Sequence, residues 1–405
     1  MTSAAVRAWR WWFAIPLSLR IAVGVWIALL VGVFVRVLIQ PPMTQSVVPI
    51  YLYAGEQWRA GGPLYHQKTG MDLYRNPPGV AALFAPLSLL PPKPAALLWR
   101  LACVLAYLAG VRSLVRDLLP PLTAGRRAVV WVSAAVLAIP AVNNGQINLM
   151  IVAAALLGAG ACARGWWAAA WWLAFAGWFK VYPLAVGLLC VLVAPRQLGW
   201  RLAVTTAVLF GLPFLLQHPT YVWDRHVEFV HEMKTDDRTG AEVSFLRAPR
   251  DWTVLPRVWF DVAVPRAISQ PVALAAAAGL AAVVWVGRRS GFLPPLLLGL
   301  LWIVLFGPAT EMNTYSVLAP VAGSVAVGSR SKWVSACGWV ASGLLLAAVV
   351  RGSFPSDAAF KLVELQPIAA LLLLAGVIGG ITLSASASSP GAAGPAAGPR
   401  PPAGS

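Results

Sequence analysis

Long apolar runs alternate along most of the chain with short stretches rich in Arg, Gly, Pro or Asn. An apolar run of about 20 residues with few charges is typical of a helix that crosses a membrane. The pattern therefore predicts an all-α, polytopic membrane protein with about twelve spans, at 18–39, 95–115, 128–143, 148–163, 166–179, 182–195, 202–217, 271–287, 292–307, 315–328, 334–350 and 366–383.

One stretch can be interpreted in two ways. Lys180 and Pro183 interrupt residues 165–195, which form either two short spans or one long span. A single span would reverse the side of everything downstream. With two spans and an inner N-terminus, the short basic loops all fall inside, as expected for the cytoplasmic face of a membrane protein. Their basic residues are Arg112, Arg116, Arg126, Arg127, Arg164, Arg196, Arg201, Arg288, Arg289, Arg330 and Lys332.

Composition excludes an ordinary soluble domain, since 59% of the residues are hydrophobic and only 11% are charged. We expect residues 1–383 to form a single transmembrane domain with both termini in the cytoplasm. The first apolar run lacks a small-residue cleavage pattern and is expected to be an uncleaved span. The tail at 384–405 is rich in Ala, Gly, Pro and Ser and is expected to be a disordered cytoplasmic segment.

Three polar motifs interrupt the apolar pattern, and the predicted topology brings all three to the outer ends of spans. Each has a plain structural explanation: a hairpin turn, a lysine that reaches toward the headgroups, and a carboxylate at a helix start. Their common side instead predicts a polar cleft that opens outward. The motifs are "VNNGQINLM" at 142–150 with Asn144, Gln146 and Asn148, "GWFKVYP" at 177–183 with Lys180 and Tyr182, and "GPATEMNTYS" at 307–316 with Glu311, Asn313 and Tyr315.

Two external loop regions, 40–94 and 217–270, are expected on the same outer face. The first contains a short helix around Tyr51 that is expected to lie in the membrane interface. It also contains Tyr65 and Arg75, residue types that suit a sugar phosphate, because Arg binds phosphate bidentately and aromatic side chains hold sugars.

The order of these motifs resembles the polyprenyl-phosphate-mannose-dependent mannosyltransferases, a family of GT-C membrane glycosyltransferases. The similarity spans most of residues 20–320. The matching residues are Tyr51, Gly62, Leu64, Tyr65, Pro77, Pro78, Pro86, Leu90 and Pro91, then Gly145, Gln146 and Asn148, then Lys180 and Pro183, and finally Pro308, Tyr315 and Pro320.

The resemblance implies a GT-C-like fold in a bacterial cell membrane and an inverting transfer of a hexose such as mannose. The donor would be a polyprenyl-phosphate sugar, and the acceptor a lipid or glycan of the cell envelope, both within reach of membrane lipids. No metal, cofactor or nucleic-acid partner is expected. In this family an aspartate four residues before the interfacial tyrosine is the expected base, but Val47 stands there. A histidine expected near 308–315 is also missing.

Glu311 is therefore the candidate base, with Glu56 and Asp72 as the other acids of the first outer loop. Candidate substrate contacts are Lys180 and Arg75 for phosphate, Gln146 and Asn148 for sugar or phosphate, and Asn144, Tyr65, Tyr182, Asn313 and Tyr315 beside them.

Two other functions stay open at this point. A transporter or lipid flippase would also place ionisable residues among membrane helices, although transporters usually hold them near the midplane and often show internal repeats. We find no such repeat here. The second alternative is a catalytically degenerate relative that acts as a scaffold, which the valine at position 47 favours.

Overall fold

A computed structural model describes residues 12–66, 68–235, 250–308, 310–352 and 364–387. Within these residues the chain is helical and contains no strand, which confirms the all-α prediction. The elements are α2 (Leu17–Ile39), α3 (Val48–Ala60), α4 (Pro78–Phe84), η1 (Leu87–Leu89), α5 (Pro92–Ser113), η2 (Leu114–Leu118), α6 (Ala124–Asn144), α7 (Asn148–Ala161), α8 (Trp166–Phe179), α9 (Leu184–Val193), α10 (Pro195–Gly211), η3 (Leu212–Leu215), α11 (Pro219–Thr235), α12 (Val254–Phe260), α13 (Arg266–Val286), η4 (Arg288–Ser290), α14 (Leu293–Phe306), η5 (Met312–Leu318), α15 (Ala319–Gly328), α16 (Lys332–Gly352) and α17 (Leu365–Ala387).

Every predicted span coincides with a helix, but many of these helices are short. In the described chain, 7 helices are long and apolar enough to cross a membrane: α2, α5 with η2, α6, α10 with η3, α13, α16 and α17. Helix α9 has only 10 residues, which rise about 15 Å against a hydrocarbon core of about 30 Å. The count of twelve spans is therefore not confirmed.

The chain reverses direction at Lys180. Helix α8 ends at Phe179, Lys180 is extended, and α9 begins at Leu184. A Cβ built on Gly177 would meet the Leu184 side chain, and one built on Gly187 would lie 3.5 Å from Leu173. Gly177 near the end of α8 thus contacts the start of α9, and Leu173 one turn earlier in α8 contacts Gly187 further along α9, so the two helices are antiparallel. Residues 165–195 thus form two helices rather than one long span.

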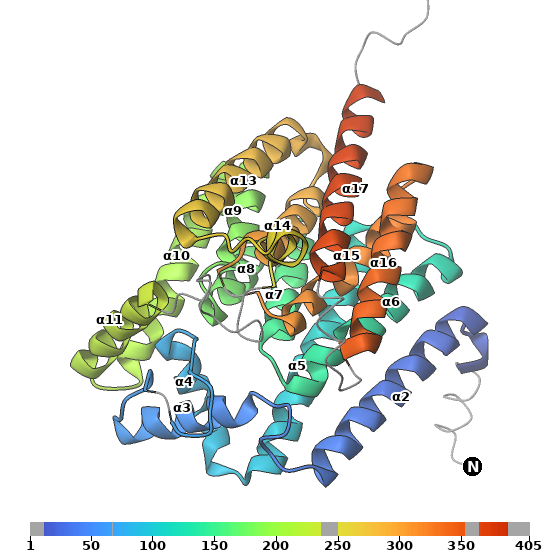
Figure 1. Cartoon of the computed structure of the whole chain (residues 1–405). Coiled ribbons are helices and arrows are strands. Elements are labelled where there is room, and N and C mark those ends of the chain that lie inside the picture. Colours follow the sequence, from blue (N-terminus) through green and yellow to red (C-terminus); the bar gives the residue numbers. More distant parts are fainter. Residues whose placement is uncertain (1–11, 67, 236–249, 309, 353–363, 388–405) are drawn as a thin grey trace, which may run out of the picture.

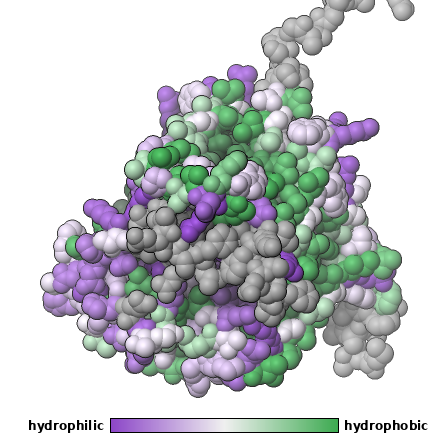
Figure 2. Space-filling model, viewed as in Figure 1, coloured by the Kyte–Doolittle hydropathy of each residue, from purple (hydrophilic) through white to green (hydrophobic). Residues whose placement is uncertain are grey.

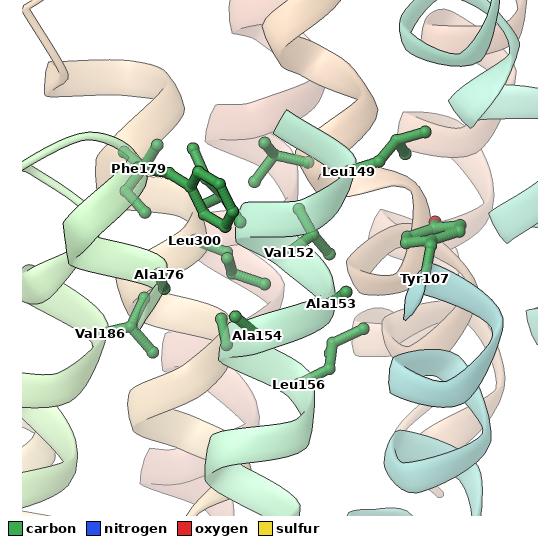
Figure 3. Packing of buried hydrophobic residues seen from close by; sticks show 14 of the residues in the cluster. Tyr107, Leu149, Val152, Ala153, Ala154, Leu156, Ala176, Phe179, Val186 and Leu300 are labelled. Carbon is green, nitrogen blue, oxygen red and sulfur yellow. The ribbon is translucent and has the colours of Figure 1, made fainter. Parts of the chain in front are cut away.

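Helix α7 occupies the centre of the bundle. In Figure 3 its Ala153 lies beside α5, which carries Tyr107, while Phe179 lies on the other side. Small side chains allow this close approach, and a Cβ on Gly110 of α5 would already lie 3.0 Å from the Ala153 Cα. Nearly every residue of α7 is buried, so its polar first turn at Asn148 is held in a fixed position.

The two outer segments meet at one end of the bundle. Gln217 Nε2 donates to the Trp58 carbonyl at 2.9 Å, and the Tyr221 hydroxyl donates to the Gly62 carbonyl at 2.8 Å. Figure 1 shows α3, α4 and α11 grouped at the lower left, and hydrophilic residues gather over that corner in Figure 2. Described parts of both loop regions therefore meet at one end of the bundle, the end at which α7 begins.

The opposite end of α5 and α7 carries basic residues. Arg164 Nη1 lies 2.5 Å from Asp117 Oδ2, and Arg116 Nε lies 2.7 Å from Asp117 Oδ1. These pairs join the end of η2 to the residues after α7, where the sequence predicts the cytoplasmic face.

Helix α17 continues through Ala387, so residues 384–387 of the predicted tail are helical. The remainder of that tail, 388–405, and residues 236–249 of the second outer loop lie outside the described residues.

Candidate functional site

A chain of hydrogen bonds joins two of the three polar motifs. Gln146 Nε2 donates to Glu311 Oε2 at 3.1 Å, and Asn148 Nδ2 donates to Gln146 Oε1 at 2.6 Å. Gln146 and Asn148 are buried, whereas Glu311 is half-buried. Because Gln146 Oε1 accepts from Asn148, the Gln146 NH₂ group is turned toward the Glu311 carboxylate. Asn148 thus fixes the orientation of the Gln146 amide.

Gly145 sets the path of the loop that carries Gln146. Its φ is +73°, in the left-handed region, and it caps the end of α6. A Cβ there would lie 2.4 Å from a Val48 side-chain carbon. The Gly145 carbonyl also accepts a 2.9 Å bond from Trp99 Nε1. Only glycine suits both this conformation and this space, so the loop enters α7 along one path.

Glu311 stands where the chain turns from α14 into η5. The Thr314 Oγ1 accepts from the Glu311 backbone N–H at 3.1 Å, and the two residues form a reciprocal capping box. The carboxylate therefore has a structural role at a helix start. It still presents Oε2 to Gln146, so capping and a second role can coexist.

Lys180 brings the third motif to the same place. Its Nζ lies 5.7 Å from the centroid of the Tyr182 ring. Burial by itself would lower the pKa of Lys180, but Tyr182, Tyr51 and Glu311 act together to raise it above its usual value. Lys180 therefore carries a positive charge at neutral pH, within electrostatic reach of the Glu311 carboxylate.

Tyr51 of α3 completes the cluster from the first outer segment. The residue is buried, and its ring centroid lies 4.9 Å from that of Phe84. Burial raises the pKa of Tyr51 to about 12, against the opposing effects of Lys180, the Ile147 backbone and the Asn76 side chain. Its hydroxyl is thus a neutral hydrogen-bonding group beside the ammonium. We call Tyr51, Gln146, Asn148, Lys180 and Glu311 the outer polar cluster.

Helix α4 seats the first outer segment against the Lys180 turn. A Cβ on Gly79 would lie 2.8 Å from the ring of Trp178, two residues before Lys180. A Cβ on Gly55 of α3 would lie 2.5 Å from the Phe84 carbonyl carbon. These close contacts need glycine and hold α3, α4 and the end of α8 together.

Three of the predicted substrate contacts instead bond to distant backbone. The Tyr65 hydroxyl donates to the Asn76 carbonyl at 2.9 Å, and the Tyr315 hydroxyl donates to the Arg250 carbonyl at 2.6 Å. Asn144 Nδ2 donates to the Gln45 carbonyl at 3.3 Å. Tyr315 and Asn144 tie the outer segments to the bundle, whereas Tyr65 joins two parts of the first outer segment. None of the three is part of the outer polar cluster.

The remaining predicted residues lie apart or at the edge of the cluster. Arg75 Nη1 forms a 2.9 Å ion pair with Asp72 Oδ2, and Glu56 is exposed on α3. Tyr182 faces Lys180 as described, and Asn313 is half-buried in η5. Val47, where the resembled family has its aspartate, donates its backbone N–H to the Asn144 carbonyl at 3.0 Å.

Sequence reasoning missed Tyr51, which lies beside the Lys180 ammonium, and Asn76, whose side chain interacts with Tyr51, as site residues. Tyr51 is expected from sequence only as part of an interfacial helix. The burial of Asn76 is evident from the structure alone.

The cluster combines a carboxylate, a charged ammonium and three neutral hydrogen-bonding groups at one end of the bundle. Among the residues that the structure describes, no three His, Cys, Asp or Glu side chains are grouped so that they could hold a metal ion. The Glu311 carboxylate can remove a proton here, and the Lys180 ammonium can stabilise a departing anion.

Both a family profile and a solved structure match this chain. The profile of glycosyltransferase family 87 matches residues 74–310, more than half of the chain. Among solved structures, the chain is similar to ArnT from Cupriavidus metallidurans bound to undecaprenyl phosphate, with 14% sequence identity, a TM-score of 0.31, and coverage of 90% of this chain and 76% of that chain. No curated protein sequence matches.

Proposed function

Since the chain belongs to glycosyltransferase family 87, we propose that it transfers a hexose, such as mannose, from a polyprenyl-phosphate donor to a lipid or glycan acceptor of the cell envelope. It is a membrane glycosyltransferase with its polar residues gathered at one end of the helix bundle. The proposal places that end on the outer face of a bacterial inner membrane, because the basic loops lie at the opposite end.

The observation that carries the proposal is the grouping of Glu311, Gln146 and Lys180. In an inverting transfer, the acceptor hydroxyl attacks the anomeric carbon and the bond from that carbon to the phosphate oxygen breaks. Glu311 would take the hydroxyl proton, and polyprenyl phosphate would leave with the bonding electrons. Lys180 would stabilise the negative charge that develops on the departing phosphate.

Gln146 supports this assignment because its amide fixes one carboxylate oxygen of Glu311 at 3.1 Å. A general base must be held within hydrogen-bond reach of the proton that it removes. The loop through Gly145 and the start of α7 provide that support from the buried side. The Glu311 carboxylate also accepts from the Thr314 backbone N–H in the capping box, so a second donor helps to fix its position.

The test is transfer by the purified full-length protein in detergent or nanodiscs. Polyprenyl-phosphate mannose, glucose and galactose would each be supplied with a mixed envelope-lipid extract, and release of polyprenyl phosphate would be measured against a protein-free control. Transfer from one donor, lost in Glu311→Gln, supports the proposal. Failure of every donor to bind or to react would overturn it.

A further inference from the structure

A second polar site lies at the same end of the bundle. The chain between α2 and α3 folds over the start of α5 and the end of α6, leaving a small pocket of about 20 Å³ that is open to solvent. Polar and charged side chains from all three helices line it, namely Arg36, Lys93, Arg100, Ser46 and Asn143.

The pocket is strongly basic. Arg36, Lys93 and Arg100 line it, and among the described residues none of those lining it is acidic. The two guanidinium groups both bond to Asn143: Arg36 Nη1 donates to its side chain, and Arg100 Nη2 donates to its carbonyl at 2.8 Å. Like charges held together without a carboxylate create a positive potential that attracts an anion.

Arg100 is the fixed part of this site. Only 2% of it is exposed, and Nε, Nη1 and Nη2 all donate to oxygen atoms, those of Val142, Ala96 and Ser46 among them. A buried cation without a charged partner is costly. The neutral oxygen atoms around it reduce that cost, and an anion in the pocket would reduce it further.

The simplest structural explanation is that basic residues stabilise the C-terminal end of α2. This explanation holds for Lys93, whose Nζ donates to the Leu38 carbonyl at 2.6 Å. Arg36 also lies in the last turn of α2, but its donors go to Gln45 Oε1 at 2.6 Å and to Asn143 instead of to helix carbonyls. Arg100 caps another helix, because its Nε and Nη2 donate to the Val142 and Asn143 carbonyls at the end of α6. These roles at helix ends place each base, but they do not explain why no acid stands among the described residues that line the pocket.

The pocket opens where the outer leaflet would meet the protein. Leu38 and Ile39 beside its mouth are 52% and 74% exposed, at the end of a helix that is long and apolar enough to span a membrane. Figure 1 shows α2 at the edge of the bundle. Exposed apolar side chains next to a cationic pocket suit a ligand with both an acyl chain and a phosphate.

The loop at 142–148 separates this pocket from the outer polar cluster. Asn143 faces Arg36 on one side, and Gln146 faces Glu311 on the other. The ammonium of Lys180 belongs to the second side. An anion in the pocket is therefore not the one beside Lys180.

We propose that Arg36, Lys93 and Arg100 form a binding site for the phosphate headgroup of a membrane lipid, separate from the Lys180 phosphate site. The proposal does not depend on the proposed transfer reaction. The lipid is either an anionic phospholipid or a polyprenyl phosphate, which share the same headgroup chemistry.

Native mass spectrometry of the full-length protein in a neutral detergent would test this site. Phosphatidylglycerol, polyprenyl phosphate and neutral phosphatidylcholine would be titrated separately, with inorganic phosphate as a competitor. The test variant is Arg36→Gln with Lys93→Gln, which keeps the buried Arg100. Arg59→Gln, an exposed arginine at the same end of the bundle, is the matched control, and Arg36→Lys tests rescue by charge alone.

Each charge removed should weaken binding of the phosphate lipid about fivefold. The double variant should thus lose most of its binding of one phosphate lipid, whereas Arg59→Gln and Arg36→Lys should retain it. Which lipid is lost shows whether the natural ligand is an anionic phospholipid or a polyprenyl phosphate. Lys180→Met should leave binding of phosphatidylglycerol unchanged, which separates this site from the proposed donor phosphate site. Equal lipid binding by wild type and the double variant, with matching thermal stability, would overturn the proposal. The proposal would also be overturned if millimolar inorganic phosphate displaced the lipid and the protein bound phosphate lipids no better than phosphatidylcholine. The pocket would then hold a free anion.

Discussion

Glu311 accepts a hydrogen bond of 3.1 Å from the side chain of Gln146, although 165 positions separate the two residues in the sequence. The contact joins the turn before η5 to the loop before α7. It places the acid group opposite a buried amide and within electrostatic reach of Lys180.

Replacing the carboxylate tests its basicity. Glu311→Gln keeps the shape and the hydrogen-bonding capacity but removes the base, so we expect the transfer rate to fall by about 10²–10⁴-fold while donor binding stays near normal. Single-turnover transfer with a saturating donor measures the effect. Glu56→Gln, which alters an exposed acid on α3, is the control. Wild-type turnover in Glu311→Gln, with a small loss of stability of about 0.3–1 kcal/mol, would leave Glu311 as a helix cap only and shift attention to Glu56 and Asp72.

Removing the ammonium tests the phosphate site of the donor. Lys180→Met keeps the length and the apolar stem, so we expect donor affinity to fall by about 10–100-fold through loss of a charged hydrogen bond. Binding of polyprenyl-phosphate sugar to the purified protein measures it. Lys68→Met, which changes a lysine placed over the Tyr53 ring, serves as the matched change. Unaltered affinity in a folded Lys180→Met protein would mean that this lysine only extends toward the headgroups.

Cysteine labelling tests the orientation. An impermeant maleimide should label Asp224→Cys on α11 in intact cells and should label Ser331→Cys only after permeabilisation, because the basic loops are expected inside. Background should be low, since Cys103, Cys162, Cys190 and Cys337 are all buried. Labelling of Ser331→Cys in intact cells would reverse the predicted orientation of the second half.

A buried carboxyl in the second outer loop should make stability depend on pH. Burial raises the pKa of Asp251 to about 6 from 3.8, although hydrogen bonds from Thr253 lower it. A raised pKa means that the folded state favours the protonated acid, so the charged form costs stability above pH 6 and the cost declines as pH falls toward 3.8. Between pH 7.5 and 5 the free energy of unfolding should rise by about 1 kcal/mol from this group.

Asp251→Asn is the matched variant for that prediction. It keeps an oxygen that can accept from the Thr253 N–H, now 2.9 Å from Asp251 Oδ1, but it cannot ionise. Thermal unfolding at both pH values should show a higher stability for the variant at pH 7.5 and a smaller gain on acidification. The same pH response in wild type and Asp251→Asn would contradict the assignment to this residue.

The sequence predicted the helical elements well because apolar runs report directly on burial in lipid or in a helix bundle. Residues 166–179 were predicted as a span, and α8 has those bounds. The number of crossings could not be predicted as well. A short helix such as α9 is apolar because other helices pack around it. The sequence alone does not distinguish a helix buried by protein from a helix buried in lipid.

The polar site was predictable in part for a similar reason. A lysine or a glutamate in an apolar chain is conspicuous, and both Lys180 and Glu311 belong to the outer polar cluster. The roles of Tyr65 and Tyr315 could not be read from sequence, because each hydroxyl bonds to a backbone carbonyl, that of Asn76 in the same outer segment and that of Arg250 in the other outer segment. Arg36 and Arg100 lie within or beside apolar runs, and the rule that ionisable residues at membrane depth deserve a functional hypothesis would have found them.

The loop through Gly145 also limits how this protein can change over generations. Asn143 and Gln146 are three positions apart and serve opposite neighbours, Arg36 and Glu311. Inserting or deleting one residue between them would turn at least one of these side chains away from its partner, whereas the long outer segments can vary in length without that effect. Descendants of this sequence should therefore exchange side chains along the loop far more readily than they alter its length, and the two sites on either side of it should be inherited together.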